Sequence, residues 1–295
     1  MEINTIQPTT LISIIICSQD DVLSHILLDN IDKTIGVDYE IIHIFNEKNK
    51  YSIFEAYNLG VQRAKGDILC FQHNDIEYLT SNLGCEVVSA LKDARVGACA
   101  VAGANYMRKS PSYYPIGEGF NVINLVQATS SGHDEIWKSY SNITNIVVFD
   151  GLWFCIKREC FNKVAFDTKT FSGFHFYDID ISTQLIVNGY KILALPDVLI
   201  KHYSGGFTNT TWLKNSFLYA QKWSKHLPIS CREINSTLSY NIECSALYSS
   251  FRRIILSKLF YLLGSWCRFA KSVTGKGPIR SLIIIYKHHK RQYND

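Results

Sequence analysis

Apolar and polar positions along the first hundred residues form blocks whose lengths suit strands and helices in turn. Apolar runs rich in β-branched residues occupy 11–17, 39–45 and 68–71, as expected for strands covered on both faces. Between them, residues 22–33 and 52–64 carry apolar side chains at helical spacing. The short connections predict a β-α-β-α-β unit with right-handed crossovers and a parallel sheet.

Each of these predicted strands ends in polar residues, and parallel strands would bring the ends to one edge. The ends are Cys17-Ser18, Asn46 and His73-Asn74-Asp75. In open α/β sheets, ligands bind outside the carboxyl ends of the strands. A carboxylate such as Asp75 can hold a divalent metal or a sugar hydroxyl there, whereas an ordinary polar turn is the alternative. The convergence of three ends favours a site.

The pattern continues as an α/β unit to about residue 210. We predict helices over 83–94 and 181–188, and strands over 96–102, 146–149, 152–157, 191–195 and 198–201. Residues 105–145 lack periodicity and are interpreted as irregular. Asp178 and Asp180 precede the second of these helices, where capping of the helix dipole explains them as well as catalysis does. No Gly-x-Gly-x-x-Gly follows a strand, which disfavours a dinucleotide fold.

The composition indicates what kind of protein this is and in which cellular compartment we expect it. The 295 residues are 47% hydrophobic and 19% charged, which is typical of a soluble globular chain. The nine cysteines are dispersed and indicate buried thiols in a reducing compartment. No secretion signal begins the sequence, and no apolar run reaches the roughly 18 residues of a spanning helix. We therefore expect a cytoplasmic protein.

The charge is concentrated at the C-terminal end of the chain. Residues 251–295 hold ten Lys and Arg against one acid, so this stretch carries +9 and residues 1–250 carry −5. That asymmetry argues against a nucleic-acid binder. Residues 211–295 are predicted to form a helical extension, helical throughout 207–250, whose part from 251 onward is basic and amphipathic. We expect it to bind an anionic membrane surface at the inner face of the cytoplasmic membrane; packing on the body or a homo-oligomer contact are the alternatives.

The ordered motifs resemble a known family over roughly residues 10–210. They are Ala56-Tyr57-Asn58-Leu59-Gly60, His73-Asn74-Asp75, Asp150-Gly151, Tyr177-Asp178-Ile179-Asp180 and His202. This sequence resembles family 2 glycosyltransferases of the GT-A fold, and looks closest to the branch named after a streptomycin-biosynthesis protein. The resemblance implies a mostly parallel, Rossmann-like sheet sandwiched by helices. It also implies a nucleotide-sugar donor, commonly a UDP-sugar.

The resemblance assigns a donor pocket to the edge of the sheet. Cys17, Ser18 and Asn46 would meet the base and ribose, and Asn58 would line the pocket from the second helix. Tyr57 stands where the family often has Arg, which removes one charged contact. His73-Asn74-Asp75 occupies the position of the family's Asp-x-Asp signature. Asp75 and His202 would then hold Mn²⁺ or Mg²⁺, with His73 shaping the pocket and Asn74 completing the turn.

The acceptor side follows from the same resemblance. Asp178 matches the catalytic base, with Tyr177 in place of the family's Glu, and Asp180 is the second candidate. Gly151 and Trp153 lie in the segment that contacts the acceptor, where Trp153 either stacks on a sugar or packs in the core. The expected activity is inverting transfer to a saccharide or lipid-linked saccharide in bacterial surface polysaccharide synthesis. The alternative is a degenerate transferase that binds nucleotide or glycan as a scaffold.

Overall fold

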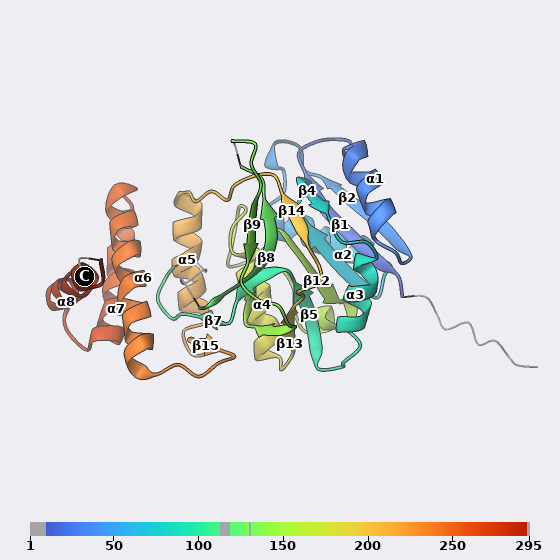
Figure 1. Ribbon diagram of the computed structural model, residues 1–295. Helices are drawn as coiled ribbons and strands as arrows, with labels where there is room; N and C mark the ends of the chain where they lie inside the picture. The colour runs from blue at the N-terminus through green and yellow to red at the C-terminus, as the bar shows by residue number, and fades with distance from the viewer. Residues whose placement is uncertain (1–9, 113–118, 130, 294–295) are drawn as a thin grey trace, which may run out of the picture.

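The computed structural model describes residues 10–112, 119–129 and 131–293. A body with a central sheet occupies one end of the molecule and a layer of C-terminal helices the other (Figure 1). The C-terminal helices are α6 (Ser236–Leu256), α7 (Leu263–Thr274) and α8 (Pro278–Tyr293). Helix α5 (Thr210–Lys222) lies between that layer and the body.

The body is built on a seven-stranded sheet of order β10-β13-β5-β12-β3-β1-β2. Its first strand, β1, pairs in parallel with β2 and β3, whereas β12 runs antiparallel to both of its neighbours. The predicted polar edge therefore exists, because the first three strands end side by side. The strands are β1 (Ile12–Ser18), β2 (Tyr39–Phe45), β3 (Ile68–Gln72), β5 (Val96–Ala100), β10 (Thr144–Ile146), β12 (Trp153–Lys157) and β13 (Lys191–Ala194).

Helices cover both faces of this sheet, as the buried strands require. Ile15 and Phe71 face one apolar cluster, while Ile14 and Cys70 face the other. A capping box between Ser52 and Glu55 starts α2 on the first face. The sheet-covering helices are α1 (His25–Thr34), α2 (Ile53–Arg63), α3 (Leu83–Ala90) and α4 (Tyr177–Val187), with short 3-10 turns η1 (Glu47–Asn49) and η2 (Arg158–Asn162). The α/β fold class expected from the sequence is confirmed.

A second sheet includes two strands, β8 and β9, from the region 105–145 that was expected to be irregular. Its order is β11-β6-β8-β14-β4, with β9 paired to β8. The prediction for 105–145 was wrong for β8 because Asn124 interrupts its apolar pattern; this amide is buried and donates to the Pro196 and Val198 carbonyls at 2.9 Å each. The strands are β4 (Ile76–Tyr78), β6 (Ala102–Ala104), β8 (Asn121–Gln127), β9 (Glu135–Lys138), β11 (Val148–Phe149) and β14 (Ile200–His202).

The C-terminal part departs from one continuous helical extension. Helix α5 packs on the body through Trp212 and Tyr219, whose rings lie 5.9 Å and 5.6 Å from that of Phe176. Uniform helix over 207–250 was wrong, because residues 223–235 contain β15 (Ile229–Ser230), which pairs with β7 (Tyr106–Met107). Helices α6, α7 and α8 pack together beyond it. No helix in the described ranges is long and apolar enough to cross a membrane.

Candidate active site at the carboxyl edge of the sheet

Two short strands bring His73, Asp75 and His202 together just beyond the sheet edge. The chain leaves β3 at Gln72, turns at His73-Asn74 and enters β4 after Asp75. Strand β14 pairs antiparallel with β4, which places His202 opposite Ile76. The backbone N–H of Tyr203, the residue after His202, also donates to the Asp75 carbonyl at 3.0 Å. Strand pairing therefore joins segments that lie far apart in the sequence.

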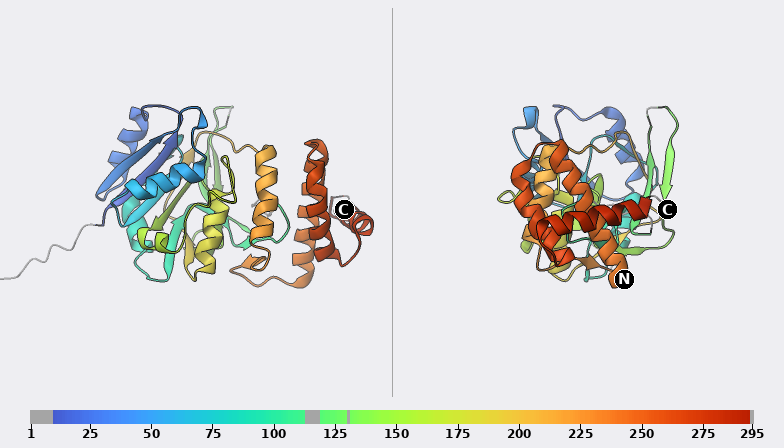
Figure 2. Two further views of the ribbon diagram at one scale, coloured as in Figure 1. Left: turned by 180° about the vertical axis from the view of Figure 1, so that it is seen from behind. Right: turned by 90° about the vertical axis from the view of Figure 1, so that its left-hand side faces the viewer.

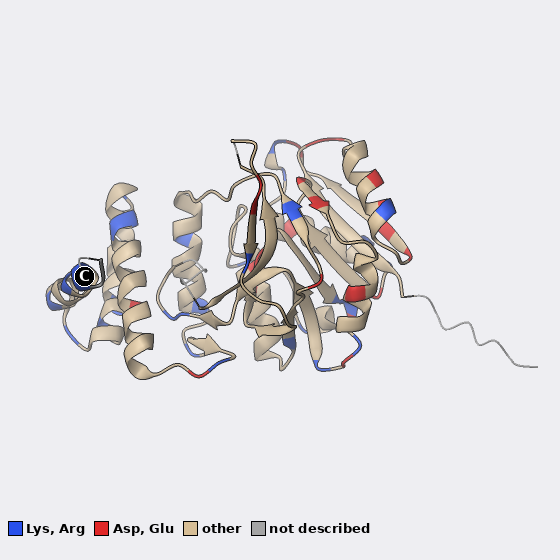
Figure 3. Ribbon diagram, viewed as in Figure 1, with Lys and Arg blue, Asp and Glu red and all other residues tan. Residues whose placement is uncertain are grey.

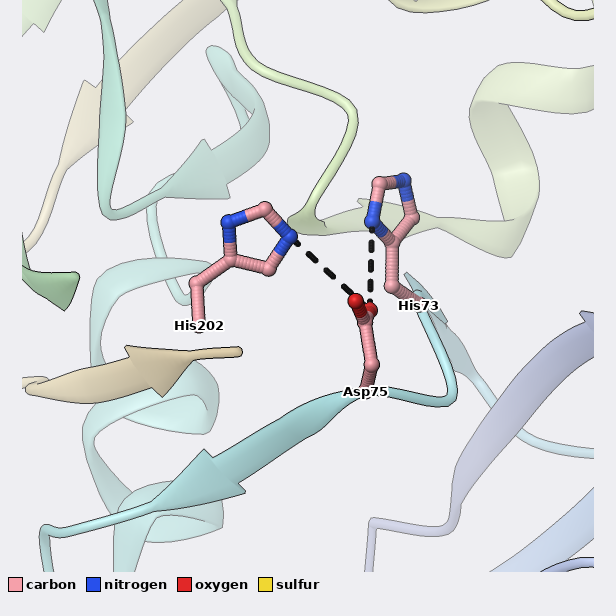
Figure 4. A group of neighbouring side chains, drawn as sticks. All are labelled: His73, Asp75 and His202. Carbon is pink, nitrogen blue, oxygen red and sulfur yellow. Dashed lines mark ion pairs between the residues drawn. The ribbon is translucent and has the colours of Figure 1, made fainter. Parts of the chain in front are cut away.

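The three side chains converge on a common point (Figure 4). Asp75 Oδ1 lies 3.6 Å from His73 Nδ1 and 3.8 Å from His202 Nε2. One donor atom from each residue lies within 4.8 Å of the others. Two imidazole nitrogens and one carboxylate oxygen at this spacing can bind a transition-metal ion. His73 therefore joins the two ligands that the sequence predicted.

The orientation of His202 is set by Gln127. The Gln127 amide nitrogen donates to the carbonyls of Ala128, His202 and Ser204 at 3.0–3.1 Å. Its Oε1 is therefore an acceptor and lies 3.2 Å from His202 Nδ1. That bond requires the proton on Nδ1 and leaves the Nε2 lone pair facing Asp75, which is how metal-binding histidines are usually held.

Tyr177 sets the orientation of His73 in a similar way. Its hydroxyl donates to the Gly151 carbonyl at 3.1 Å, and so accepts from His73 Nε2 at 3.3 Å. The proton is then on Nε2, and the Nδ1 lone pair faces Asp75. Burial lowers the pKa of His73, which favours the neutral ring that a metal ligand requires. The donor set thus fits a divalent cation.

A cavity of about 610 Å³ opens beside this cluster. Four of the expected donor residues line it, namely Cys17, Ser18, Asn46 and Asn74, together with residues that include Tyr51, Phe174 and Phe207. The Ser18 hydroxyl lies 2.8 Å from His43 Nε2. The Asn46 side chain exchanges two hydrogen bonds with the backbone of Tyr51 at 2.8 and 2.9 Å, so it shapes the wall of the cavity. Asn74 lies between the cavity and the cluster.

Asp178 stands at the start of α4 next to Tyr177. Its Oδ2 accepts the Gly151 N–H at 3.0 Å. Burial, with a smaller contribution from the nearby Asp150 carboxylate, raises the pKa of Asp178 to about 7. A carboxylate with a pKa near the working pH is suited to general base catalysis. Asp178 does not line the donor cavity, which suits a group that would act on the acceptor.

The other candidate for the base, Asp180, has structural partners instead. It is buried, and its carboxylate accepts from Lys222 Nζ at 2.7 and 2.9 Å, Trp223 Nε1 at 2.7 Å and Gln184 at 2.7 Å. These bonds join α4 to α5. Because these bonds occupy the Asp180 carboxylate, Asp178 is the carboxylate at this helix terminus that can still accept a proton from a substrate.

Three further residues of the expected site face the interior. Trp153 is 0% exposed and its Nε1 lies 3.3 Å from the Tyr78 hydroxyl, so core packing is the one of its two alternatives that this conformation adopts. Tyr57 is buried among the rings of Phe71, Phe166 and Tyr177. Asn58 exchanges hydrogen bonds with the backbone of Phe166 at 2.8 and 3.2 Å.

Sequence reasoning did not anticipate the contributions of Asp150, Gln127, Phe174 and Phe207. Asp150 was noted only as part of the Asp150-Gly151 motif, and its polar position after β11 was the available signal. Gln127 lies at the end of β8, in the region interpreted as irregular. The exposed rings of Phe174 and Phe207 stack at 6.3 Å beside the cavity, and no local pattern marks that pairing.

Residues 13–220 match the model of a family described as "Glycosyltransferase like family". The chain is similar to a crystal structure of GalNAc-T7 with UDP, GalNAc and Mn²⁺ at 13% identity and a TM-score of 0.46, covering 74% of this chain and 50% of that one. It thus spans about half the length of that protein.

Two further solved structures are similar at this level. One is A197 from STIV, with 14% identity and a TM-score of 0.41, covering 66% of this chain and 86% of that one. The other is the mannosyltransferase PcManGT from Pyrobaculum calidifontis in complex with GDP-Man and Mn²⁺, with 13% identity and a TM-score of 0.42, covering 94% of this chain and 78% of that one. No curated protein sequence matches significantly.

Proposed function

The chain belongs to the glycosyltransferase-like family, and from that premise we propose that it transfers a sugar from a nucleotide-sugar donor to a saccharide acceptor. The observation that carries the proposal is the position of the His73–Asp75–His202 cluster beside a cavity of about 610 Å³. The cavity has room for a nucleoside against Cys17, Ser18 and the Asn46 loop. A donor bound there extends its diphosphate past Asn74 to the cluster.

His73, Asp75 and His202 would hold a divalent cation at the diphosphate. The two imidazoles favour Mn²⁺ over Mg²⁺, since Mg²⁺ prefers oxygen ligands. When bound, such a cation stabilises the negative charge that develops on the leaving diphosphate. His73 supplies the ligand that the missing first Asp of the signature would otherwise provide.

Asp178 would act as the general base for the acceptor hydroxyl. The carboxylate takes the hydroxyl proton as the acceptor oxygen forms its bond to the anomeric carbon. The bond from that carbon to the diphosphate breaks, and the diphosphate leaves with the electron pair. The Gly151 N–H holds Asp178 Oδ2, so the proton would be taken by the other oxygen, Oδ1.

Finer assignments rest on the sequence resemblance alone. We propose a UDP-sugar as donor, an inverting outcome, and a saccharide or lipid-linked saccharide as acceptor in bacterial surface polysaccharide synthesis. The likeness to the streptomycin-biosynthesis branch belongs with these proposals. From the composition and the basic C-terminal stretch we also propose a cytoplasmic location at the inner face of the membrane; a homo-oligomer contact of that stretch is the alternative.

The decisive experiment measures nucleoside diphosphate release from a panel of nucleotide sugars, with and without Mn²⁺. We expect Mn²⁺-dependent release that increases with a saccharide acceptor. Binding of nucleotide without release from any donor, with any acceptor extract, would instead support the scaffold alternative.

A further inference from the structure

The turn between α6 and α7 carries a cluster of exposed apolar side chains. Ile255, Leu256, Phe260 and Tyr261, here called the apolar tip, are 43–74% exposed. Lys258, two residues after the end of α6, lies in the left-handed region at φ 56°, and η3 (Phe260–Leu262) follows. Soluble proteins usually expose such residues singly. Four of them in one turn indicate a surface that meets an apolar partner.

The apolar tip takes only Ile255 from the helically spaced apolar positions of the amphipathic segment, here called the stripe, and most of the stripe is not exposed. The stripe residues Ile254, Leu262 and Trp266 are buried against α6 and α7, and Trp266 Nε1 donates to the Leu247 carbonyl at 2.9 Å. The stripe thus packs within the protein, as the alternative reading of this segment expected. Among the large apolar side chains described in residues 251–291, only the apolar tip and a row on α8, Ile279, Ile283 and Tyr286, are exposed.

Charge identifies the partner of the apolar tip. Residues 251–293 contain ten Lys and Arg and no Asp or Glu. In Figure 3 the charged positions along α7 and α8 are accordingly blue. Arg252 and Lys258 lie next to the tip in the sequence and are exposed. Apolar side chains surrounded by cations match the interface of an anionic bilayer, where each basic residue near the surface contributes on the order of 1 kcal/mol.

The contacts of Arg253 place the apolar tip near the candidate active site. Arg253 Nη1 donates to Thr208 Oγ1 at 2.8 Å, and its guanidinium lies 4.7 Å from the Trp212 ring centroid. Thr208 belongs to the segment between His202 and α5, whose Phe207 and Asn209 line the cavity. In Figure 1 the C-terminal ends of α6 and β14 lie toward the same side of the molecule. Helix α8 lies across the outer end, away from the body (Figure 2).

We propose that the apolar tip inserts into an anionic bilayer and holds the mouth of the cavity beside the membrane surface. A lipid-linked saccharide would there present its hydroxyl to Asp178. This last step rests on the proposed function, whereas membrane insertion does not.

The test compares two full-length double variants in co-sedimentation with vesicles. The vesicles contain phosphatidylcholine with phosphatidylglycerol, or phosphatidylcholine alone. Leu256→Gln with Tyr261→Gln should weaken partitioning to the anionic vesicles by about tenfold or more. Ile279→Gln with Ile283→Gln removes the same number of exposed apolar side chains from α8 and should partition as wild type. Wild-type binding by the tip variant, or equal loss in both variants, would overturn the proposal.

Two controls separate this proposal from the others. Release of nucleoside diphosphate with a water-soluble acceptor should be unchanged in the tip variant. If wild type binds vesicles but never releases nucleoside diphosphate, the proposed function is wrong and membrane insertion of the apolar tip is still supported. If wild type releases nucleoside diphosphate but does not bind vesicles, the proposed membrane insertion is wrong. A tip variant that changes from dimer to monomer in sedimentation velocity shows that the partner is a second copy, and also overturns the proposal.

Discussion

At the residue scale, the proposed chemistry depends on where protons are held around a few side chains. Gln127 and Tyr177 fix the tautomers of His202 and His73, so that both rings present a lone pair to the side of Asp75. Burial and Asp150 keep Asp178 partly protonated near neutrality. Each of these contacts can be tested by removing one group.

Removing the proposed base should stop transfer and leave the donor site intact. We expect Asp178→Asn to lower kcat by about 10²–10⁴-fold, with unchanged nucleotide affinity in calorimetry. The folded-state pKa of Asp178 lies above its unfolded value, so its charge costs stability as the pH rises through about 7. The variant should therefore unfold at higher urea concentration than wild type above pH 7. Retained turnover would reassign the base.

The pH dependence of transfer should report the Asp178–Asp150 pair. Since the base must be ionised, kcat/KM should rise with pH and level off above about 7. Asp150→Asn removes the neighbouring negative charge, which lowers the pKa of Asp178 and moves the rise in kcat/KM to lower pH. The midpoint of this rise should stay above the usual pKa range of an Asp because burial is the larger cause of the shift. A pH–rate profile identical to that of wild type would contradict the pairing.

Metal affinity should respond both to a ligand and to a residue that orients one. Asp75→Ala should abolish Mn²⁺-dependent donor binding. Gln127→Leu removes the acceptor for His202 Nδ1–H and should weaken Mn²⁺ binding by about 10–100-fold in isothermal titration calorimetry. Asn74→Ala, an exposed neighbour that donates to Asp20, is the control and should keep wild-type Mn²⁺ affinity. Equal Mn²⁺ affinity in Gln127→Leu and wild type would argue against the assigned tautomer.

At the scale of elements, the site depends on how α4 is held between the sheet and α5. Asp178 and Asp180 share the first turn of α4, yet one faces Gly151 and the other is bound by Lys222 and Trp223 of the α5 end. Two residues on a helix differ by about half a turn, which separates their surroundings. The same short sequence therefore supplies one candidate base and one structural anchor.

Loss of that anchor should reduce stability rather than chemistry. Asp180→Asn leaves Lys222 with a weakened partner and should lower the free energy of unfolding by roughly 3 kcal/mol, as for a buried ion pair that loses one member. Asp167→Asn removes the more exposed partner of Lys222 and should cost less than Asp180→Asn does. Urea denaturation measures both. If the Asp180→Asn variant unfolds like wild type but has no transfer activity, Asp180 would be the base and Asp178 the structural residue.

At the scale of the whole molecule, the basic C-terminal helices are a packed layer and not a detachable tail. Helix α6 crosses residue 251, and Trp266 of α7 contacts Leu247 and Phe251 of α6. From the sequence, residues from 251 onward were expected to act as a basic amphipathic segment that binds an anionic membrane surface. The packing shows that deletion of residues 251–295 also opens a buried core.

We therefore expect the 251–295 deletion to destabilise the protein. The loss should be at least about 3 kcal/mol, the cost of removing one buried tryptophan, and is measured by thermal unfolding. The Leu256→Gln, Tyr261→Gln variant should keep the wild-type melting temperature because both side chains are exposed. A truncated chain that melts like wild type would show that the layer is independent of the body.

The sequence by itself determined the features that arise from neighbouring residues. Apolar runs and helical spacing predicted β1, β2, β3 and the helices between them, because these patterns reflect burial on one chain segment. The ordered motifs located Asp75, Asp178 and His202, and the charge count located the basic layer. Breaks such as Asn124 hid β8, since a buried amide satisfied by distant carbonyls looks like a loop residue in the sequence.

Only the tertiary structure decided what those residues face. The β4–β14 pairing brings His202 beside Asp75 and His73, which completes a group of three possible ligands, and packing of β12 removes Trp153 from the surface. Helix packing likewise buries the stripe around Trp266 and leaves Leu256 and Tyr261 exposed. These outcomes depend on contacts between segments far apart in the chain, and the free energy of such contacts is set by which surfaces meet, not by local propensity.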